Sequence, residues 1–144
     1  MRQTLHLSLG SSKIRLRFSN VFGTTDLPIT AVSVALPING SAGVSAIQPH
    51  TLKKVTFSGN ESIIVPNGAL VLSDPIDISV QAQSMISVTM YLKNGQTTNF
   101  ITGHPGSRTT SWYGRGNQVN AANFTSADSS AHWYVYASRS SSFY

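Results

Sequence analysis

The chain has 144 residues, of which 40% are hydrophobic and only 10% are charged, and it contains no cysteine. This length fits one domain that can bury a core without disulfides, while zinc-thiolate sites and thiol nucleophiles are excluded. The net charge of +5 comes from ten Lys and Arg against five Asp and Glu. These cations are scattered instead of interleaved with aromatics, so the charge does not indicate nucleic-acid binding.

Alternation of apolar and polar residues with a period of two runs through the chain and predicts β-strands. The alternating runs lie at residues 4–9, 13–18, 31–36, 76–80, 86–92 and 133–137. Successive side chains of a strand point to opposite faces, so we expect one buried and one solvent-facing side in each run. In the first run this places Leu5, Leu7 and Leu9 in the core and His6 in solvent.

The second run carries the one basic stripe of the sequence. Lys13, Arg15 and Arg17 alternate there with apolar residues. We interpret the stripe as the solvated outer face of a single strand, because a groove that follows phosphates needs more cations and interleaved aromatics.

Turn signals separate the runs. Gly10-Ser11-Ser12 predicts a hairpin between the first two strands. Asn39-Gly40, Asn67-Gly68 and Asn94-Gly95 supply residues that tolerate positive φ. No window has a helical stripe with caps, and residues 44–54 hold one short helical turn at most.

Many short strands with frequent turns predict an all-β fold, either an antiparallel β-sandwich or a barrel. Residues 1–137 are expected to form this domain. Residues 138–144 are rich in serine and have no periodicity, which predicts an irregular tail.

Catalytic acyl transfer needs a nucleophile, a base that takes its proton and donors for the developing oxyanion. A Gly-x-Ser-x-Gly elbow is missing, since Gly106-Ser107-Arg108 lacks the second glycine. Asp128 precedes His132 by four residues, but we expect Asp128 to close a turn before the next strand. We therefore predict no catalytic residues in this chain.

Metal and cofactor sites are not predicted either. The four histidines lie far apart and lack the paired spacing of a zinc site: His6, His50, His104 and His132. Asp26, Asp74 and Asp77 can meet in space, but five acidic residues in all are too few for a dedicated calcium cage.

Residues 103–115 form the densest polar stretch and are the candidate ligand-binding loop. Its candidate residues are His104, Ser107, Arg108, Trp112, Tyr113 and Arg115. Arg108 can offer a bidentate fork to a carboxylate, and Trp112 a stacking face for a sugar or ring. The alternative is a purely structural loop, in which Arg108 satisfies backbone carbonyls and Trp112 fills the core.

Aromatic residues gather in the last third of the chain. Trp133 shares a predicted strand face with Val135 and is expected in the core, while Tyr134 and Tyr136 point the other way. Exposed rings of this kind can form a glycan-binding surface by stacking.

Low charge with many hydroxyl and amide side chains is typical of secreted β-proteins. Asn39, Asn60 and Asn123 each begin an Asn-x-Ser/Thr sequon and are candidate glycosylation sites. No stretch of about 20 apolar residues is present to span a membrane. From the composition we predict a secreted protein; residues 1–4 lead straight into a strand without an apolar leader, so its leader is expected to be absent from this chain.

Three segments together resemble one enzyme family. They are Arg15-Leu16-Arg17-Phe18-Ser19-Asn20 with Phe22-Gly23, then Ala69-Leu70-Val71-Leu72-Ser73-Asp74-Pro75, then Thr109-Thr110-Ser111-Trp112. From about residue 2 to 136 the chain is similar to the opening β-domain of secreted fungal and actinobacterial GDSL-type (SGNH) ester hydrolases. The resemblance implies a jelly-roll-like sandwich beside a hydrolase domain. The family's Gly-Asp-Ser nucleophile block, oxyanion donors and Asp-x-x-His segment do not occur here, so hydrolase activity of this chain stays open.

Three functions follow as alternatives. The first is a non-catalytic accessory domain, a fragment or truncated form of such a hydrolase, that shapes substrate access or docks to a hydrolase domain; an exposed apolar face would favour it. The second is a free-standing carbohydrate-binding, lectin-like protein, favoured by exposed aromatics in a shallow groove. The third is an interaction module that forms a homodimer through an edge strand or an exposed apolar face.

Overall fold

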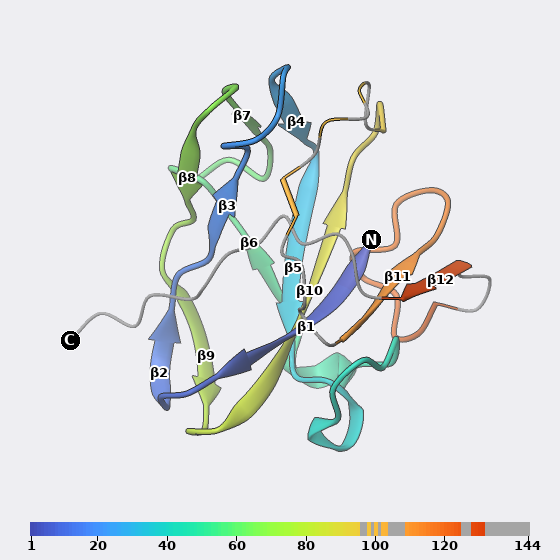
Figure 1. Ribbon diagram of the computed structural model, residues 1–144. Helices are drawn as coiled ribbons and strands as arrows, with labels where there is room; N and C mark the ends of the chain where they lie inside the picture. The colour runs from blue at the N-terminus through green and yellow to red at the C-terminus, as the bar shows by residue number, and fades with distance from the viewer. Residues whose placement is uncertain (96–97, 99, 101, 104–108, 125–127, 132–144) are drawn as a thin grey trace.

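Short strands joined by tight turns make up the computed structural model of the chain (Figure 1). It describes residues 1–95, 98, 100, 102–103, 109–124 and 128–131. The strands of these residues are β1 (Arg2–Leu7), β2 (Ser11–Ile14), β3 (Arg17–Ser19), β4 (Leu27–Ile29), β5 (Ala31–Ala35), β6 (Lys53–Val55), β7 (Ile63–Val65), β8 (Leu70–Leu72), β9 (Ile76–Val80), β10 (Ser84–Tyr91), β11 (Thr110–Tyr113) and β12 (Asp128–Ala131). Two short 3₁₀ turns are also present, η1 (Ile38–Gly40) and η2 (Pro49–Thr51). The helical turn expected within residues 44–54 is confirmed as η2.

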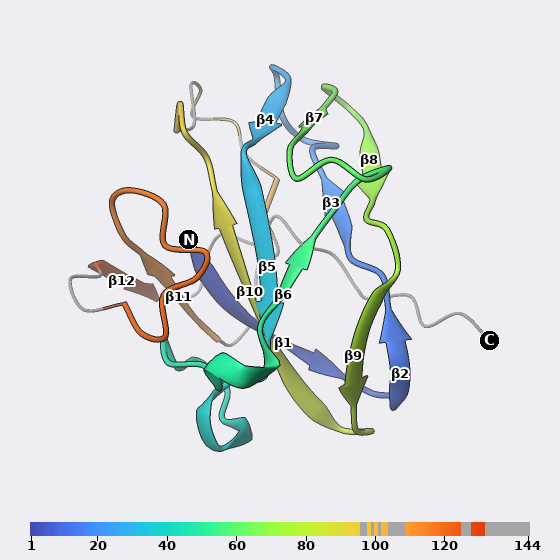
Figure 2. The ribbon, with the colours of Figure 1, turned by 180° about the vertical axis from the view of Figure 1, so that it is seen from behind.

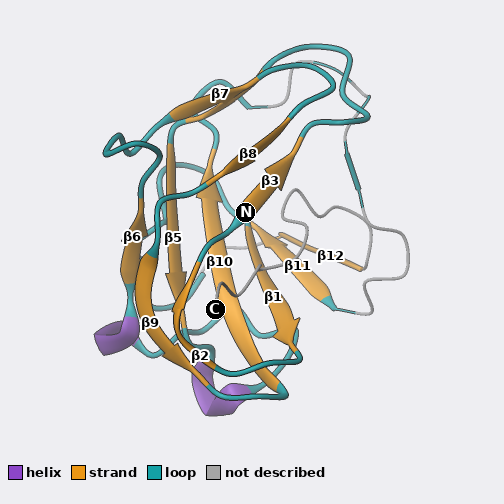
Figure 3. Cartoon of the chain, turned by 90° about the vertical axis from the view of Figure 1, so that its left-hand side faces the viewer, coloured by secondary structure: helices purple, strands orange, loops and turns teal. Residues whose placement is uncertain are grey.

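The strands form two layers. One is a six-stranded sheet in the order β12-β11-β1-β10-β5-β6; in Figure 2, β12 and β11 lie on the left and β10, β5 and β6 to their right. The other consists of three two-stranded sheets, β2-β9, β3-β8 and β4-β7, and Figure 3 shows β2, β9, β3 and β8 in front of the larger sheet.

Every strand pair in the described residues is antiparallel. The predicted all-β antiparallel fold is therefore confirmed, and the two layers have the arrangement of a β-sandwich. The finer expectation of a jelly-roll-like connectivity stays a prediction.

The hydrophobic core lies between the layers and follows the predicted alternation. Ile14, Leu16 and Phe18, the apolar residues of the second run, are almost completely buried. The ring of Phe18 packs edge-on against that of Phe57, with 5.6 Å between the ring centroids. The run itself is divided between β2 and β3, so the predicted single basic strand is two short strands.

The turn at Gly10 does not form the predicted hairpin. β1 pairs with β10 in the six-stranded sheet, whereas β2 pairs with β9, so the chain crosses between the layers here. A Cβ atom at Gly10 would lie 3.0 Å from the amide nitrogen of Ala82 and 3.1 Å from the carbonyl oxygen of Val80, so a larger residue would have to push this backbone away. Leu9 lies in this crossing and is 55% exposed, contrary to its predicted place in the core.

The Asn-Gly turns have the left-handed backbone that the sequence predicted. In the first of them, φ is +52° at Asn39 and +65° at Gly40. The glycine amides of all three turns donate hydrogen bonds to backbone carbonyls: Gly40 to Pro37, Gly68 to Asn20, and Gly95 to Leu92.

The second face of the six-stranded sheet is buried as well, which corrects the expectation of a solvent-facing side. Its central side chains are polar and at most 2% exposed: Arg2, Thr4, Ser33, Ser87 and Thr89. We call these five residues the polar layer. Residues 43–45 and 119–124 cover it, because their backbone groups accept or donate hydrogen bonds to its side chains. His6, at the end of the same face, is exposed as predicted.

Arg2 lies at the centre of the polar layer. Its guanidinium donates to the hydroxyl of Thr89 at 2.7 Å and to the carbonyl oxygens of Ser45 and Ala121 at 2.6 Å each. Its Cζ atom lies 4.6 Å from the ring centroid of Phe124, in the range of a cation–π contact. Burial lowers the pKa of Arg2 to about 10, so the side chain is still charged at neutral pH. Arg2 thus joins β1 to two loops that are distant in sequence.

The C-terminal expectations are only partly covered by the described residues. Asp128 does not close a turn, because it opens β12 and pairs with Tyr113 in β11. The predicted strand at 133–137 and the tail at 138–144 lie outside the described residues. Among the described residues, no helix has the length and apolar character needed to cross a membrane.

Replacing Ser87 by alanine is expected to raise the free energy of unfolding by about 1 kcal/mol. The Ser87 hydroxyl is buried and has no hydrogen-bond partner among the described residues, so the change removes an unsatisfied group. Ser33→Ala on the paired strand is the matched control, because the Ser33 hydroxyl donates to the Val119 carbonyl and its loss should be destabilising by about 1 kcal/mol. Equilibrium urea unfolding measures both; shifts of the same sign would contradict this account.

Arg2→Met is expected to lower the free energy of unfolding by about 3 kcal/mol or more, because two buried carbonyls lose charged donors. Amide hydrogen exchange should accelerate most at residues 43–45 and 119–124, which Arg2 connects. Arg17→Met is the control: Arg17 is exposed, and its change should stay within about 0.5 kcal/mol. Unchanged exchange in both loops of the Arg2 variant would refute the role given to Arg2.

Candidate functional site

The predicted ligand-binding loop is described only in part. His104, Ser107 and Arg108 lie outside the described residues, so their arrangement stays a prediction. Trp112 and Tyr113 are the last two residues of β11, and Arg115 follows in the next turn.

Trp112 and Tyr113 are separated by the sheet, because neighbouring strand residues point to opposite faces. Trp112 pairs with Arg2 and lies on the side of the polar layer, where its indole N–H donates to the Gly43 carbonyl at 3.0 Å. Tyr113 lies on the side that faces the second layer. The structure therefore does not bring these two rings to one site.

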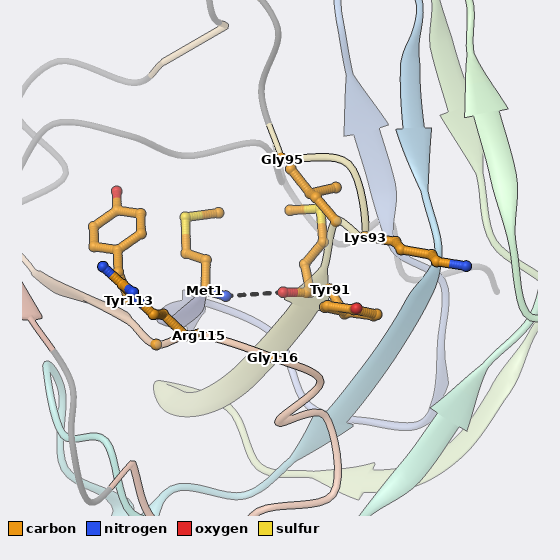
Figure 4. A pocket seen from close by; sticks show the side chains of 10 residues that line it. Met1, Tyr91, Lys93, Gly95, Tyr113, Arg115 and Gly116 are labelled. Atoms are coloured by element: carbon orange, nitrogen blue, oxygen red, sulfur yellow. Dashed lines mark hydrogen bonds between the residues drawn. The ribbon is translucent and has the colours of Figure 1, made fainter.

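Tyr113 and Arg115 do meet, at a cavity of about 400 Å³ (Figure 4). The cavity lies where β1 begins, β10 ends and β11 leaves the six-stranded sheet. Met1, Met90 and Leu92 line it with Tyr113, which gives it two thioethers, an aliphatic side chain and a phenol ring. A volume in this range is typical of small-molecule sites.

Two backbone hydrogen bonds fix the methionine side of the cavity. The Met1 amine donates to the Met90 carbonyl at 2.9 Å, and the Met90 amide donates to the Met1 carbonyl at 2.8 Å. These bonds continue the β1–β10 ladder one residue beyond β1. The two methionines are consequently neighbours on the same side of the sheet.

The opposite side is formed by the turn after β11. A Cβ atom at Gly114 would collide with Nε2 of Gln118, so glycine at this position lets the Gln118 side chain pack closely against the turn. The Gln118 side chain then donates to the Arg115 carbonyl at 3.0 Å, which closes the turn. The sequence thereby places Arg115 beside Tyr113, as Figure 4 shows.

The cavity is bordered by cations. Lys93 and Arg115 contribute to its lining, while Asp and Glu are absent from the described residues that line it. Burial lowers the pKa of the Met1 amine to about 6, and the nearby charge of Arg2 adds to this effect. At neutral pH the amine is therefore mostly uncharged, and the positive charge of the site comes from the two side chains.

The three acids that might have met at a cation site lie apart and have separate partners. The Asp74 carboxylate accepts from the amides of Gly59 and Ser58 and from the Thr56 hydroxyl; these bonds lower its pKa, with the Gly59 bond the largest cause. Asp26 accepts from the Asn67 amide, and Asp77 pairs with Lys13 at 3.1 Å. Within the described residues there is no group of three side chains that could hold a metal ion.

The three sequon asparagines are all exposed: Asn39, Asn60 and Asn123. Asn39 lies in η1, whereas the side-chain oxygen of Asn123 already accepts a hydrogen bond from the Ser45 hydroxyl at 2.6 Å. Glycosylation at these positions stays a prediction.

Met1, Met90 and Leu92 were not among the residues that the sequence singled out. Met90 and Leu92 end the alternating run at 86–92, and Met1 immediately precedes the first strand. The signal that could have found them is their place at the strand ends, where a core closes incompletely. That signal requires the pairing of β1 with β10, which the sequence does not provide.

The chain with a free Met1 amine is expected to lose stability as the pH falls from 8 to 6. Folding lowers the pKa of this amine from 8.0 to about 6, so only unfolded chains take up a proton in this interval. The free energy of unfolding should be highest above pH 8, fall by up to about 2–3 kcal/mol through the interval, and show no further contribution of this group below it. Comparison with the Nα-acetylated chain isolates the amine, and identical pH profiles would rule the effect out.

The sequence matches no protein-family model, and a search of curated proteins finds no similar relative.

Proposed function

We propose that the chain is a non-catalytic accessory β-sandwich domain of a secreted GDSL/SGNH-type ester hydrolase, and that it docks to a hydrolase domain. The resemblance of residues 15–23, 69–75 and 109–112 to this family supports the proposal. The observation that carries the docking role is a rigid loop that holds an aromatic side chain in solvent, inside one of the segments on which the resemblance depends.

Asn20 fixes this loop from within. Its side-chain amide is buried and donates to the carbonyl oxygens of Thr25 at 2.8 Å and Val65 at 3.1 Å. A Cβ atom at Gly23 would lie 2.0 Å from the Asn20 side-chain oxygen, so the chain can turn around Asn20 only with glycine at this position. The loop is consequently held by packing and hydrogen bonds and does not depend on a partner.

The fixed loop presents Val21 and Phe22 to solvent, with exposures of 41% and 72%. The Phe22 amide donates to the Thr102 hydroxyl at 3.0 Å, which ties the loop to the segment that carries Phe100. Phe100 is 64% exposed. We call Val21, Phe22 and Phe100 the aromatic edge.

A pre-ordered, exposed aromatic edge is suited to docking. An aromatic ring buries about 150–250 Å² when it enters a partner pocket, and a loop whose backbone is already held in place loses little conformational entropy on binding. Aromatic residues are also over-represented at interface centres. Together with the missing nucleophile block, this favours an accessory over a catalytic role.

The test supplies the catalytic domain of a secreted fungal SGNH hydrolase as a separate polypeptide and measures its binding to this chain by isothermal titration calorimetry. We expect a saturable complex of about micromolar affinity, which Phe22→Ser weakens about tenfold or more. Leu9→Ser is the matched control, since Leu9 is also an exposed apolar residue but lies in the crossing between β1 and β2. Equal loss in both variants, or no complex, would refute the docking role.

The same preparations test the absence of catalysis. The chain alone should not hydrolyse p-nitrophenyl acetate, butyrate or octanoate above the buffer rate, and Ser107→Ala should behave identically. Turnover that Ser107→Ala abolishes would instead place a serine nucleophile in the loop at 103–115.

A further inference from the structure

We propose that the cavity between Met1, Met90, Leu92 and Tyr113 binds an amphiphilic monocarboxylate, with an aliphatic chain inside and the carboxylate at Arg115. This inference depends on the cavity alone and does not require the accessory role proposed above, because none of these residues belongs to the aromatic edge.

The side chains that line the interior suit a flexible apolar chain. Met1 and Met90 both line the cavity from neighbouring positions on one side of the sheet, and each ends in an unbranched thioether. Methionine side chains adapt to irregular apolar ligands because they have three rotatable bonds and a polarisable sulfur. The ring of Tyr113 and the branched end of Leu92 complete an apolar interior. A strongly polar ligand, such as a free sugar, would leave its hydroxyls without partners against these groups.

The charge at the rim selects an anionic head group. Arg115 lies beside Tyr113 at one end of the cavity, while the Lys93 side chain extends away from Met1 (Figure 4). Arg115 is therefore the residue placed to bind the head group, and Lys93 adds to the positive potential. A guanidinium binds a carboxylate through two parallel hydrogen bonds, which suits a single planar anion.

The apolar interior and the arginine at the rim together indicate the class of ligand. An apolar interior of about 400 Å³ accommodates a chain of several methylenes, and one arginine at the rim matches one carboxylate. Acetate would lack the chain, and an alcohol of equal length would lack the charge. A medium-chain carboxylate such as octanoate satisfies both ends.

The experiment titrates octanoate into the chain labelled with ¹³C at the methionine methyl groups. The chain has three methionines, and Met85 is an internal control because it lies opposite His6 on the other face of the sheet. We expect saturable shifts of the Met1 and Met90 methyl signals, an unmoved Met85 signal, and an affinity that falls about tenfold in Arg115→Gln. Arg17→Gln, a change at another exposed arginine, should bind octanoate as the parent chain does.

Two further ligands separate the parts of the proposal. Acetate should bind at least about tenfold more weakly than octanoate, and octanol should bind with an affinity that Arg115→Gln does not change. Equal binding of acetate and octanoate would mean a plain anion site and overturn the proposal. It would also be overturned if the Met1 and Met90 signals failed to move, or if Arg115→Gln bound octanoate unchanged.

Discussion

The buried positive charge of Arg2 determines how two loops cover the outer face of the six-stranded sheet. Arg2 brings a guanidinium into a layer from which water is excluded, and its hydrogen-bond partners among the described residues are one hydroxyl and two backbone carbonyls. A buried charge is tolerated only when its donors have hydrogen-bond acceptors, so the carbonyl oxygens of Ser45 and Ala121 must lie within hydrogen-bond distance of the guanidinium. The paths of the two covering loops follow from that requirement.

The same constraint positions the candidate binding site. Arg2 and Met1 are adjacent, so the contacts that fix one determine where the other lies. On one face of β1 the chain is anchored in the polar layer, and on the other it faces the core and the cavity. The contacts of Arg2 on the opposite side of the sheet thus reinforce the position of Met1, which two backbone hydrogen bonds to Met90 fix directly.

Much of the fold could be predicted from alternation, because a strand with one apolar side needs a core against that side. Ile14, Leu16 and Phe18 lie in the core as this reasoning requires. The burial predicted from alternation was wrong at Leu9 and at the polar layer, for different reasons. Leu9 lies where the chain crosses between the layers. A turn signal in the sequence does not say whether the two strands that it joins pair with each other. The polar layer is buried because backbone groups of distant loops form hydrogen bonds with its side chains. The local sequence pattern of a strand cannot predict which distant loop will cover it.

The candidate site could be predicted only in its charged and aromatic part. Tyr113 and Arg115 stand in a conspicuous polar stretch, whereas Met90 and Leu92 look like ordinary members of an alternating strand. What distinguishes them is their place at the end of β10, beside Met1 and the turn after β11, and this neighbourhood depends on strand pairing that local alternation does not report. Trp112 shows the converse: its prominence in the sequence reflects a structural bond to Gly43.

The Asn-Gly turns have a consequence for the chemical lifetime of the molecule. Asparagine before glycine is the pair most prone to lose its side-chain amide, through attack of the following backbone nitrogen on the side-chain carbonyl. Asn39, Asn67 and Asn94 are all exposed, yet the nitrogen that would attack is already committed to a carbonyl in each turn. The hydrogen bonds that reverse the chain therefore also retard its ageing, and local opening of a turn, more than solvent exposure, would set the rate of deamidation.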